Sequence, residues 1–277
     1  MLVVGGYNLP TQWLDDAEVY DPVADTWTVV PPSYSHGTIH TATLMKDGRV
    51  LVVGGCIGGG LCTERVEIFD PQNNAWTEAQ PLAADRAGQT ALLLEDGRVL
   101  VAGGWSTSDV AVGGDALLYD PQANTWTATG PMIKLRFLAQ SVPLPGGRVL
   151  VAGGMTLEDK PASKISASAE IYDPAANAWT ATADLAEARY YHGLVTLADG
   201  KVLAIGGARE YEDRWSENSF VREIERYDPV TAQWRVVAEL PQPRAEATAT
   251  LLPDGRVWLA GGWTGTAYFS DSWLIGK

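Results

Sequence analysis

Four arginines recur at equivalent places along the chain and are the most regular set of side chains suited to binding a ligand. They are Arg86, Arg136, Arg189 and Arg244, and each stands 11 residues before the second residue of a short turn. Guanidinium groups form charge-assisted hydrogen bonds to carboxylates, so four of them around one site predict an anion-binding site. The alternative is that each arginine ties its own structural repeat to a neighbouring carboxylate or carbonyl.

A second group of polar and aromatic side chains lies in one stretch, residues 208–218, with the sequence Ala-Arg-Glu-Tyr-Glu-Asp-Arg-Trp-Ser-Glu-Asn. Acidic, basic and aromatic groups together can bind a sugar by stacking and charge-assisted hydrogen bonds. We therefore expect Arg209 and Trp215 to form one wall of a binding site. A solvated charged loop explains the same residues without any ligand.

The two cysteines, Cys56 and Cys62, are separated by five residues, of which three are glycines. A spacing this flexible allows the sulfurs to meet in a disulfide that closes a loop, and it does not match a zinc site. Such a bridge would favour an oxidising, extracytoplasmic compartment. Two free thiols are the alternative.

The composition argues against several classes of partner. The chain has 277 residues, with 34 acidic and 20 basic side chains and a formal net charge of −14. This charge opposes binding to nucleic acid or to an anionic membrane surface. No apolar run reaches the roughly 18 residues of a membrane helix, and the first residues do not resemble a signal peptide. We expect a soluble protein with no nucleic-acid or membrane partner.

A double glycine that closes an apolar run recurs six times, at steps of 49, 49, 50, 53 and 55 residues. The pairs are Gly5-Gly6, Gly54-Gly55, Gly103-Gly104, Gly153-Gly154, Gly206-Gly207 and Gly261-Gly262. After five of them comes an aromatic residue with Asp-Pro, and a tryptophan follows seven residues after that aromatic residue. A fixed period of this length indicates a repeat architecture.

Each repeat predicts four short antiparallel strands. The first ends at an Asp-Gly or Gly-Gly turn, which supplies the positive φ of a tight hairpin. The second is nearly all apolar, as in residues 99–102, and suits burial on both faces. The third leads into the Asp-Pro turn, and the fourth begins at the tryptophan, whose indole can cover the sheet.

This unit resembles the Kelch repeat, which builds β-propellers. Residues 90–104 in particular are similar to bacterial Kelch proteins and to the propeller of galactose oxidase-like proteins, and the resemblance spans essentially the whole chain. It implies an all-β fold, a single Kelch β-propeller over residues 1–277, with six blades of which the first and last are incomplete. The expected blades are about 1–30 (strands 2–4), 36–80, 86–129, 136–183, 189–237 and 244–277 (strands 1–3). A five-bladed ring with an overhanging hairpin, or a fragment of a longer chain, are the alternatives.

In such a propeller the first strand is innermost, so the four arginines would circle the mouth of the central channel, on the face that carries the variable loops. In Kelch proteins that grip acidic peptides, arginines at matching positions contact the ligand. Tyr191 and His192 follow one of these arginines, and His40 holds the place of His192 in another repeat. His36 matches no repeated position. We expect His40 and His192 to line the channel wall.

The resemblance also implies two enzymatic alternatives. A bacterial sialic-acid mutarotase with six Kelch blades uses Glu and Arg soon after a double glycine, and Glu210 and Arg214 are similar in kind but differ in spacing. A copper oxidase of the galactose oxidase kind needs two histidines and two tyrosines, one of them joined to a cysteine. The run 190–192, Tyr-Tyr-His, is the local grouping that fits this second alternative.

We therefore predict a non-catalytic binding or protein-interaction module, without cofactor or metal, that recognises an acidic peptide or acidic sugar over the channel mouth. A carbohydrate-active enzyme is the alternative. The predicted ligand-binding residues are Arg86, Arg136, Arg189, Arg244, Tyr191, His192, Arg209 and Trp215.

Overall fold

The computed structural model describes residues 1–8, 12–31, 37–57, 60–108, 112, 114–156, 164–210 and 215–276. The described residues form β-strands and a short 3-10 helix, η3 (Glu217–Ser219). The chain divides into two compact units, Met1–Thr129 and Gly130–Lys277, which are described separately below. Among the described residues, the helical segments are too short to cross a membrane.

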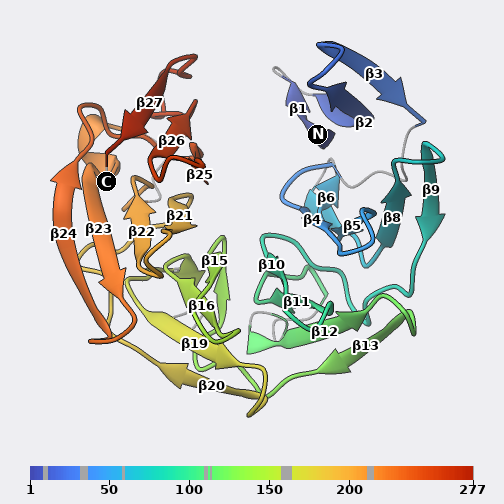
Figure 1. Cartoon of the computed structure of the whole chain (residues 1–277), viewed down its shortest axis with the longest axis horizontal. Helices are drawn as coiled ribbons and strands as arrows, with labels where there is room; N and C mark the ends of the chain where they lie inside the picture. Colours follow the sequence, from blue (N-terminus) through green and yellow to red (C-terminus); the bar gives the residue numbers. More distant parts are fainter. Residues whose placement is uncertain are drawn as a thin grey trace. The chain divides into compact units, whose positions relative to one another are not determined.

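The first unit holds three antiparallel sheets that follow the sequence repeat, shown from blue to green in Figure 1. In the order of their strands, these sheets are β1 (Leu2–Asn8)-β2 (Gln12–Asp21)-β3 (Thr26–Val30), β4 (Thr41–Leu44)-β5 (Val50–Val53)-β8 (Val66–Asp70)-β9 (Ala75–Glu78), and β10 (Thr90–Leu93)-β11 (Val99–Ala102)-β12 (Ala116–Asp120)-β13 (Thr125–Ala128). A small hairpin, β6 (Cys56–Ile57) and β7 (Leu61–Cys62), leaves the second sheet. The innermost strands β4 and β10 lie side by side.

The second unit repeats this arrangement, from green to red in Figure 1. Its sheets are β15 (Gln140–Pro143)-β16 (Val149–Ala152)-β19 (Ala169–Asp173)-β20 (Ala178–Ala181), β21 (Gly193–Thr196)-β22 (Val202–Ile205)-β23 (Glu223–Asp228)-β24 (Gln233–Glu239), and β25 (Thr248–Leu251)-β26 (Val257–Ala260)-β27 (Ser272–Ile275). A small sheet joins β14 (Arg136–Phe137), β17 (Met155–Thr156) and β18 (Lys164–Ile165). The all-β fold of four-stranded units predicted from the sequence is confirmed, and the first and last repeated sheets have three strands each in the described part of the chain.

The aromatic residue and the tryptophan of each repeat face one another across the third and fourth strands. The pairs are Tyr20 and Trp27, Phe69 and Trp76, Tyr119 and Trp126, Tyr172 and Trp179, and Tyr227 and Trp234. Their ring centroids lie 4.9–5.1 Å apart. The seven-residue spacing therefore sets the register of each outer hairpin, since directly opposed aromatic residues stabilise a sheet.

The double glycines let one blade approach the next. In the first unit, a Cβ added at Gly54 would lie only 2.1 Å from the carbonyl oxygen of Arg86, and the φ of Gly54 is +63°. The neighbouring Gly55 amide donates to that same carbonyl at 2.8 Å. Only glycine permits both the left-handed backbone and this contact. The buried second strands then form the hydrophobic core on either side.

Candidate functional site

The four repeated arginines are buried inside their blades. Arg86, Arg136, Arg189 and Arg244 are 3%, 1%, 0% and 1% exposed. In each, Nη1 donates to the carbonyl of the first glycine of the double-glycine pair that follows. The distances are 2.7 Å to Gly103, 3.0 Å to Gly153, 3.0 Å to Gly206 and 2.9 Å to Gly261. Each arginine thus links the first strand of its blade to the end of the second.

The same arginines pair with carboxylates of their own blade. Arg189 bonds to Glu225, which is fully buried. The carboxylate of Glu225 also accepts the backbone amides of Ala186 at 2.7 Å and Glu187 at 3.1 Å, which fixes the connection that enters the blade. Burial lowers the pKa of the Arg189 guanidinium, and the nearby Glu225 charge opposes that shift.

The other three arginines also lie near carboxylates: Glu170 holds the place of Glu225, whereas Asp115 and Asp271 stand two positions earlier in their repeats. The closest N–O distances are 2.8 Å from Arg136 to Glu170, 2.7 Å from Arg244 to Asp271 and 3.9 Å from Arg86 to Asp115. These contacts match the alternative to an anion-binding site, in which each arginine is bonded to carbonyls and carboxylates of its own repeat. Contact of these groups with an anionic ligand stays a prediction, and it would require exposing guanidinium groups that are at most 3% exposed.

The sequence contains a signal for two of these carboxylates, Glu170 and Glu225. Glu18, Glu67, Glu170 and Glu225 each stand three residues before the aspartate of the Asp-Pro turn. Glu67, Glu170 and Glu225 are buried to 1% exposure or less. A charged residue that recurs in a strand otherwise apolar indicates a buried partner of opposite charge.

His192 is a packing residue of the blade wall. A Cβ on Gly153 would lie 2.7 Å from its Cε1 atom, and the equivalent residues Gln89 and His40 cover Gly54 and Gly5 in the same way. Burial, with a smaller effect of the Arg189 charge, lowers the pKa of His192 to about 3. His36 lies outside the described residues.

The described residues of the chain do not form a copper centre of the kind found in such an oxidase. Cys56 and Cys62 are joined in a disulfide with sulfurs 1.97 Å apart, which closes the β6–β7 hairpin. Neither sulfur is therefore available for a bond to a tyrosine. Within the described part of the chain, no group of three or more His, Cys, Asp or Glu side chains is placed to hold a metal ion.

Of the residues 208–218, Arg214 lies outside the described part of the chain, so the structure does not place the pair that it would form with Glu210. The Glu210 carboxylate accepts the Ser219 hydroxyl at 2.8 Å. Arg209 pairs with Glu187 at 3.3 Å and with Glu223 at 3.1 Å. The positive charge of Arg209 is therefore compensated by two carboxylates.

Two of the predicted residues, Tyr191 and Trp215, belong to one aromatic cluster of the second unit, which we define as Tyr190, Tyr191, Trp215, Phe220, Trp263 and Tyr268. The Trp215 ring lies 5.3 Å from Phe220 and 5.2 Å from Trp263. The cluster runs from Phe220, which is 1% exposed, to Tyr268, which is 71% exposed. It therefore reaches the surface.

Backbone bridges hold the cluster. Ala208 pairs with both Tyr190 and Phe220, and Trp263 pairs with both Ala245 and Tyr268. The loops after two different double glycines are thereby fixed to the starts of two first strands. The sequence analysis missed Phe220, Trp263 and Tyr268, although aromatic residues concentrate in these last two loops.

A pocket of about 390 Å³ opens beside the aromatic cluster. Its apolar walls are Trp215, Pro243, Ala267 and Phe269, and its polar groups come from Ser216, Gln242, Thr264 and Thr266. The Arg244 guanidinium lies 4.2 Å from the centre of the Phe269 ring, so it packs against one of the residues that line the pocket. Apolar walls with a few hydroxyl and amide groups are typical of a ligand site.

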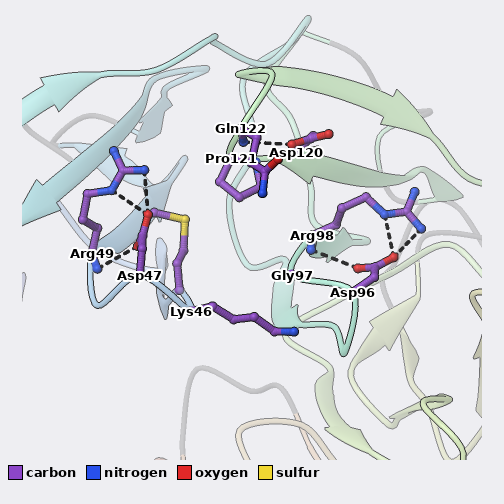
Figure 2. Close-up of a pocket in the computed structure, with 10 residues that line it drawn as sticks. Lys46, Asp47, Arg49, Asp96, Gly97, Arg98, Asp120, Pro121 and Gln122 are labelled. Carbon is purple, nitrogen blue, oxygen red and sulfur yellow. Dashed lines mark hydrogen bonds and ion pairs between the residues drawn. The ribbon is translucent and has the colours of Figure 1, made fainter.

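A second pocket, of about 420 Å³, lies among turns of the first unit (Figure 2). Its charged groups pair within their own turns: Arg49 Nη2 lies 2.7 Å from Asp47, and Arg98 Nη2 lies 2.7 Å from Asp96. Lys46 reaches across to the carbonyl of Glu95. The same turn pair recurs at Asp254 and Arg256, so these charges are a feature of the repeat and we assign this pocket no ligand.

A family model described as "Attractin/LZTR1 beta-propeller" matches residues 1–270. The chain is similar to human Kelch-like protein 23, at 35% identity over 34% of this chain and 15% of that protein, and to galactose oxidase of Gibberella zeae, at 28% identity over 35% of this chain and 14% of that protein. The matches thus span only a small part of these relatives. A solved structure described as YjhT has a TM-score of 0.71 at 18% identity, covering 98% of this chain and 93% of that one, and shows the fold alone.

Proposed function

The chain belongs to the Attractin/LZTR1 β-propeller family, and from that premise we propose that it is a non-catalytic interaction module that binds a peptide segment of a partner protein between Trp215 and Phe269. Its Kelch-type propeller supports the general role of a protein-interaction module. The pocket beside the aromatic cluster is the single observation on which the location of the site rests.

The chemistry of this pocket favours an uncharged peptide segment with an apolar or aromatic side chain. Such a side chain would insert between the Trp215 and Phe269 rings, while the amide of Gln242 and the hydroxyls of Thr264 and Thr266 would bond to the peptide backbone. Tyr268, exposed beside Trp263, extends the apolar surface past the pocket.

The preference for acidic ligands predicted from the four arginines is not part of this proposal. Those guanidinium groups are buried and bonded to carbonyls and carboxylates, and Arg209 is paired twice. With a formal net charge of −14, the molecule repels an acidic segment at long range.

A sugar is the second candidate ligand, because an indole next to hydroxyl and amide groups also suits a sugar ring. The Trp215 wall and the side chains of Gln242 and Thr264 favour it. A glycan array probed with the purified chain separates the two candidates, since a peptide site gives no glycan signal that depends on Trp215.

The test is selection of peptides from a random library displayed on phage, using the whole chain as bait. The selected peptides are synthesised, and their affinities are measured for the wild type, for Trp215→Ala and for Thr266→Arg. The arginine side chain at position 266 is expected to fill the pocket. We expect both changes to weaken binding at least tenfold, as for truncation or occlusion of a central aromatic contact.

The matched control is Trp258→Ala. Trp258 is 41% exposed on β26 and does not line the pocket, so binding is expected to stay within a factor of two. Selected peptides that bind Thr266→Arg as tightly as the wild type would overturn the proposed site. An empty selection together with a Trp215-dependent glycan signal would replace the peptide by a sugar.

A further inference from the structure

Ser216 is a polar residue of the pocket between Trp215 and Phe269 to which the proposed function assigns no role. Its hydroxyl oxygen lies 3.2 Å from the hydroxyl oxygen of Ser219, which is fully buried. The direction of the hydrogen bond between these two hydroxyls decides whether Ser216 offers a ligand a hydrogen or a lone pair.

The Glu210 carboxylate fixes that direction. The Ser219 hydroxyl donates its hydrogen to Glu210 Oε2 at 2.8 Å, and an ionised carboxylate has no hydrogen to give in return. The Ser219 oxygen can then only accept from Ser216, so the Ser216 hydroxyl is the donor of the 3.2 Å bond. Because its hydrogen is used in this way, the Ser216 oxygen is available to a ligand only as an acceptor. Among the described residues, no protein donor occupies its lone pairs.

Backbone hydrogen bonds hold Ser216 in this position. The Ser219 amide donates to the Ser216 carbonyl at 3.0 Å, and the Ser216 amide donates to the Ser219 hydroxyl oxygen at 3.2 Å. The Ser219 carbonyl accepts the amide of Arg209 at 2.9 Å. Ser219 is thus bonded through its amide, its carbonyl and its hydroxyl, and a network satisfied in this way is rigid. It anchors Ser216 at the pocket wall.

The other polar side chains of the pocket have no such fixed direction. The hydroxyls of Thr264 and Thr266 and the amide of Gln242 can each donate or accept. In the described part of the chain, none of these three side-chain groups bonds to another protein group. They can therefore adapt to either kind of group on a peptide backbone, whereas Ser216 distinguishes between ligands that carry a donor and ligands that do not.

An apolar pocket with one fixed acceptor suits an aromatic side chain that carries a polar hydrogen. Trp215 and Phe269 supply aromatic walls for the ring, and Ser216 can accept the indole N–H of a tryptophan or the phenol O–H of a tyrosine. A phenylalanine or leucine side chain would bury the Ser216 oxygen without a donor, and a buried acceptor left without a partner weakens binding.

We propose that this pocket takes a tryptophan or tyrosine side chain of the partner peptide, whose N–H or O–H donates to the Ser216 oxygen. Glu210, which acts through Ser219, is the positioning residue that keeps Ser216 an acceptor. The inference rests on the proposed function, since it specifies which side chain of the bound peptide enters the pocket.

The probes are two pairs of small uncharged compounds. N-acetyltryptophanamide is compared with its analogue methylated on the indole nitrogen, and N-acetyltyrosinamide with its O-methyl ether. Their dissociation constants for the whole chain are measured by nuclear magnetic resonance, from the amide shifts of Trp215, Ser216 and Thr264. We expect methylation to weaken binding about threefold to tenfold in at least one pair, which is the size of a net hydrogen bond. The pair that responds identifies the side chain.

Ser216→Ala removes the acceptor. A methyl group adds bulk as well as removing the hydrogen, so the decisive quantity is the ratio of the two affinities within a pair, compared between wild type and variant. We expect this ratio to fall to within about a factor of two in Ser216→Ala. Thr264→Val removes a pocket hydroxyl that is not bonded to Ser219, and this matched control is expected to leave the ratio as in the wild type.

Two variants of Glu210 test its positioning role. Glu210→Ala leaves the Ser219 hydroxyl free to donate to Ser216, so the ratio is expected to fall as it does in Ser216→Ala. Glu210→Gln keeps a side-chain oxygen that can accept from Ser219 and is expected to retain the wild-type ratio. A purely structural role of Glu210 would weaken both compounds of a pair alike and leave the ratio unmoved, which would overturn the positioning role.

Three results on the wild-type chain would overturn the proposal: no binding at millimolar concentration, equal affinities within both pairs, or amide shifts that appear away from the pocket. These measurements hold even where a protein variant fails to fold. A peptide selection that fails while the ratio persists would remove the proposed function and support the role of Ser216. A successful, Trp215-dependent selection with equal affinities within both pairs would do the reverse.

Discussion

Arg189 and Glu225 show that a charged residue that recurs in several repeats can have a structural role inside its own repeat. Both side chains are fully buried, and together they hold the end of the second strand and the connection that enters the blade. A residue that recurs with the blade is constrained by bonds that also recur with the blade. Residues that occur once, such as Trp215 and Phe269, are the better candidates for a specific ligand.

The first prediction concerns this buried pair. Glu225→Gln leaves the Arg189 guanidinium buried without a compensating charge, so we expect the free energy of unfolding to fall by about 3–5 kcal/mol. Urea denaturation followed by circular dichroism measures the change. The control is Asp254→Asn, which breaks an exposed pair with Arg256 and is expected to lower the free energy of unfolding far less than Glu225→Gln does. Losses of similar size in the two variants would contradict the role of the pair.

The second prediction concerns His192, whose pKa burial lowers to about 3 from an ordinary value of 6.5. Between these two pH values the unfolded chain binds a proton at this residue and the folded chain does not. Its effect is therefore to make stability fall as the pH drops below 6.5, by up to about 1.4 kcal/mol per pH unit.

His192→Gln removes this proton, and Gln89 shows that glutamine is accommodated at the equivalent place of another blade. Urea unfolding at pH 7.5, 6 and 5 is expected to give a shallower pH dependence for the variant than for the wild type, with the difference absent above pH 7. Parallel pH dependences would show that the imidazole is protonated in the folded protein as readily as in water.

At the level of the element, the described parts of the loops are held by backbone bridges, by packing against a neighbouring loop, or by a covalent bond. The loop that starts at Ala208 is held by its bridges to Tyr190 and Phe220, and it packs against Gly265 of the following loop. The β6–β7 hairpin is instead closed by a covalent bond between Cys56 and Cys62.

The third prediction tests the contact between the two loops that form the pocket. A Cβ on Gly265 would lie 2.1 Å from Cβ of Trp215, so Gly265→Ala must displace Trp215. We expect it to lower the stability by about 2–4 kcal/mol and to weaken peptide binding in the pocket at least tenfold.

Gly48→Ala is the control, because Gly48 has a similar positive φ and no atom within 4 Å of the added Cβ. It is expected to show only backbone strain, about 1 kcal/mol, and unchanged binding. Equal effects of the two substitutions would mean that the Trp215 contact adds nothing beyond backbone strain.

The fourth prediction concerns the disulfide. Replacing both Cys56 and Cys62 by serine opens a loop of only a few residues, so a loss of about 2 kcal/mol is expected from the chain entropy regained on unfolding. Denaturation with and without dithiothreitol measures this loss. The reductant is expected to destabilise the wild type by a similar amount and to leave the double variant unchanged. A wild type indifferent to the reductant would contradict a stabilising bridge.

At the level of the whole molecule, the periodic part of the sequence predicts what is periodic in the structure. The turns at Asp96-Gly97 and after Tyr119 set the limits of β10 to β13, because local turn chemistry and alternating burial act within one repeat. Burial of the arginines depends on a carbonyl 17 residues away, and the aromatic cluster depends on loops from two repeats. The spacing from arginine to carbonyl is the same in all four repeats and can be read from the sequence, whereas contacts between loops of different repeats leave no such regular spacing. The fold was therefore predictable, and the pocket between Trp215 and Phe269 was not.

The last prediction follows from the same repeat organisation. In a protein built of stacked units, each unit is stabilised mainly by its neighbours, so a local defect should weaken nearby sheets first. Glu225→Gln lies in β23, whose sheet meets the adjacent sheets through the first strands β15, β21 and β25. Within the second unit, hydrogen exchange is expected to show the largest loss of amide protection in β21–β24 and a smaller loss in β15–β20 and β25–β27. An equal loss in every strand would mean that the chain opens as one cooperative unit and that neighbour stabilisation does not govern its stability.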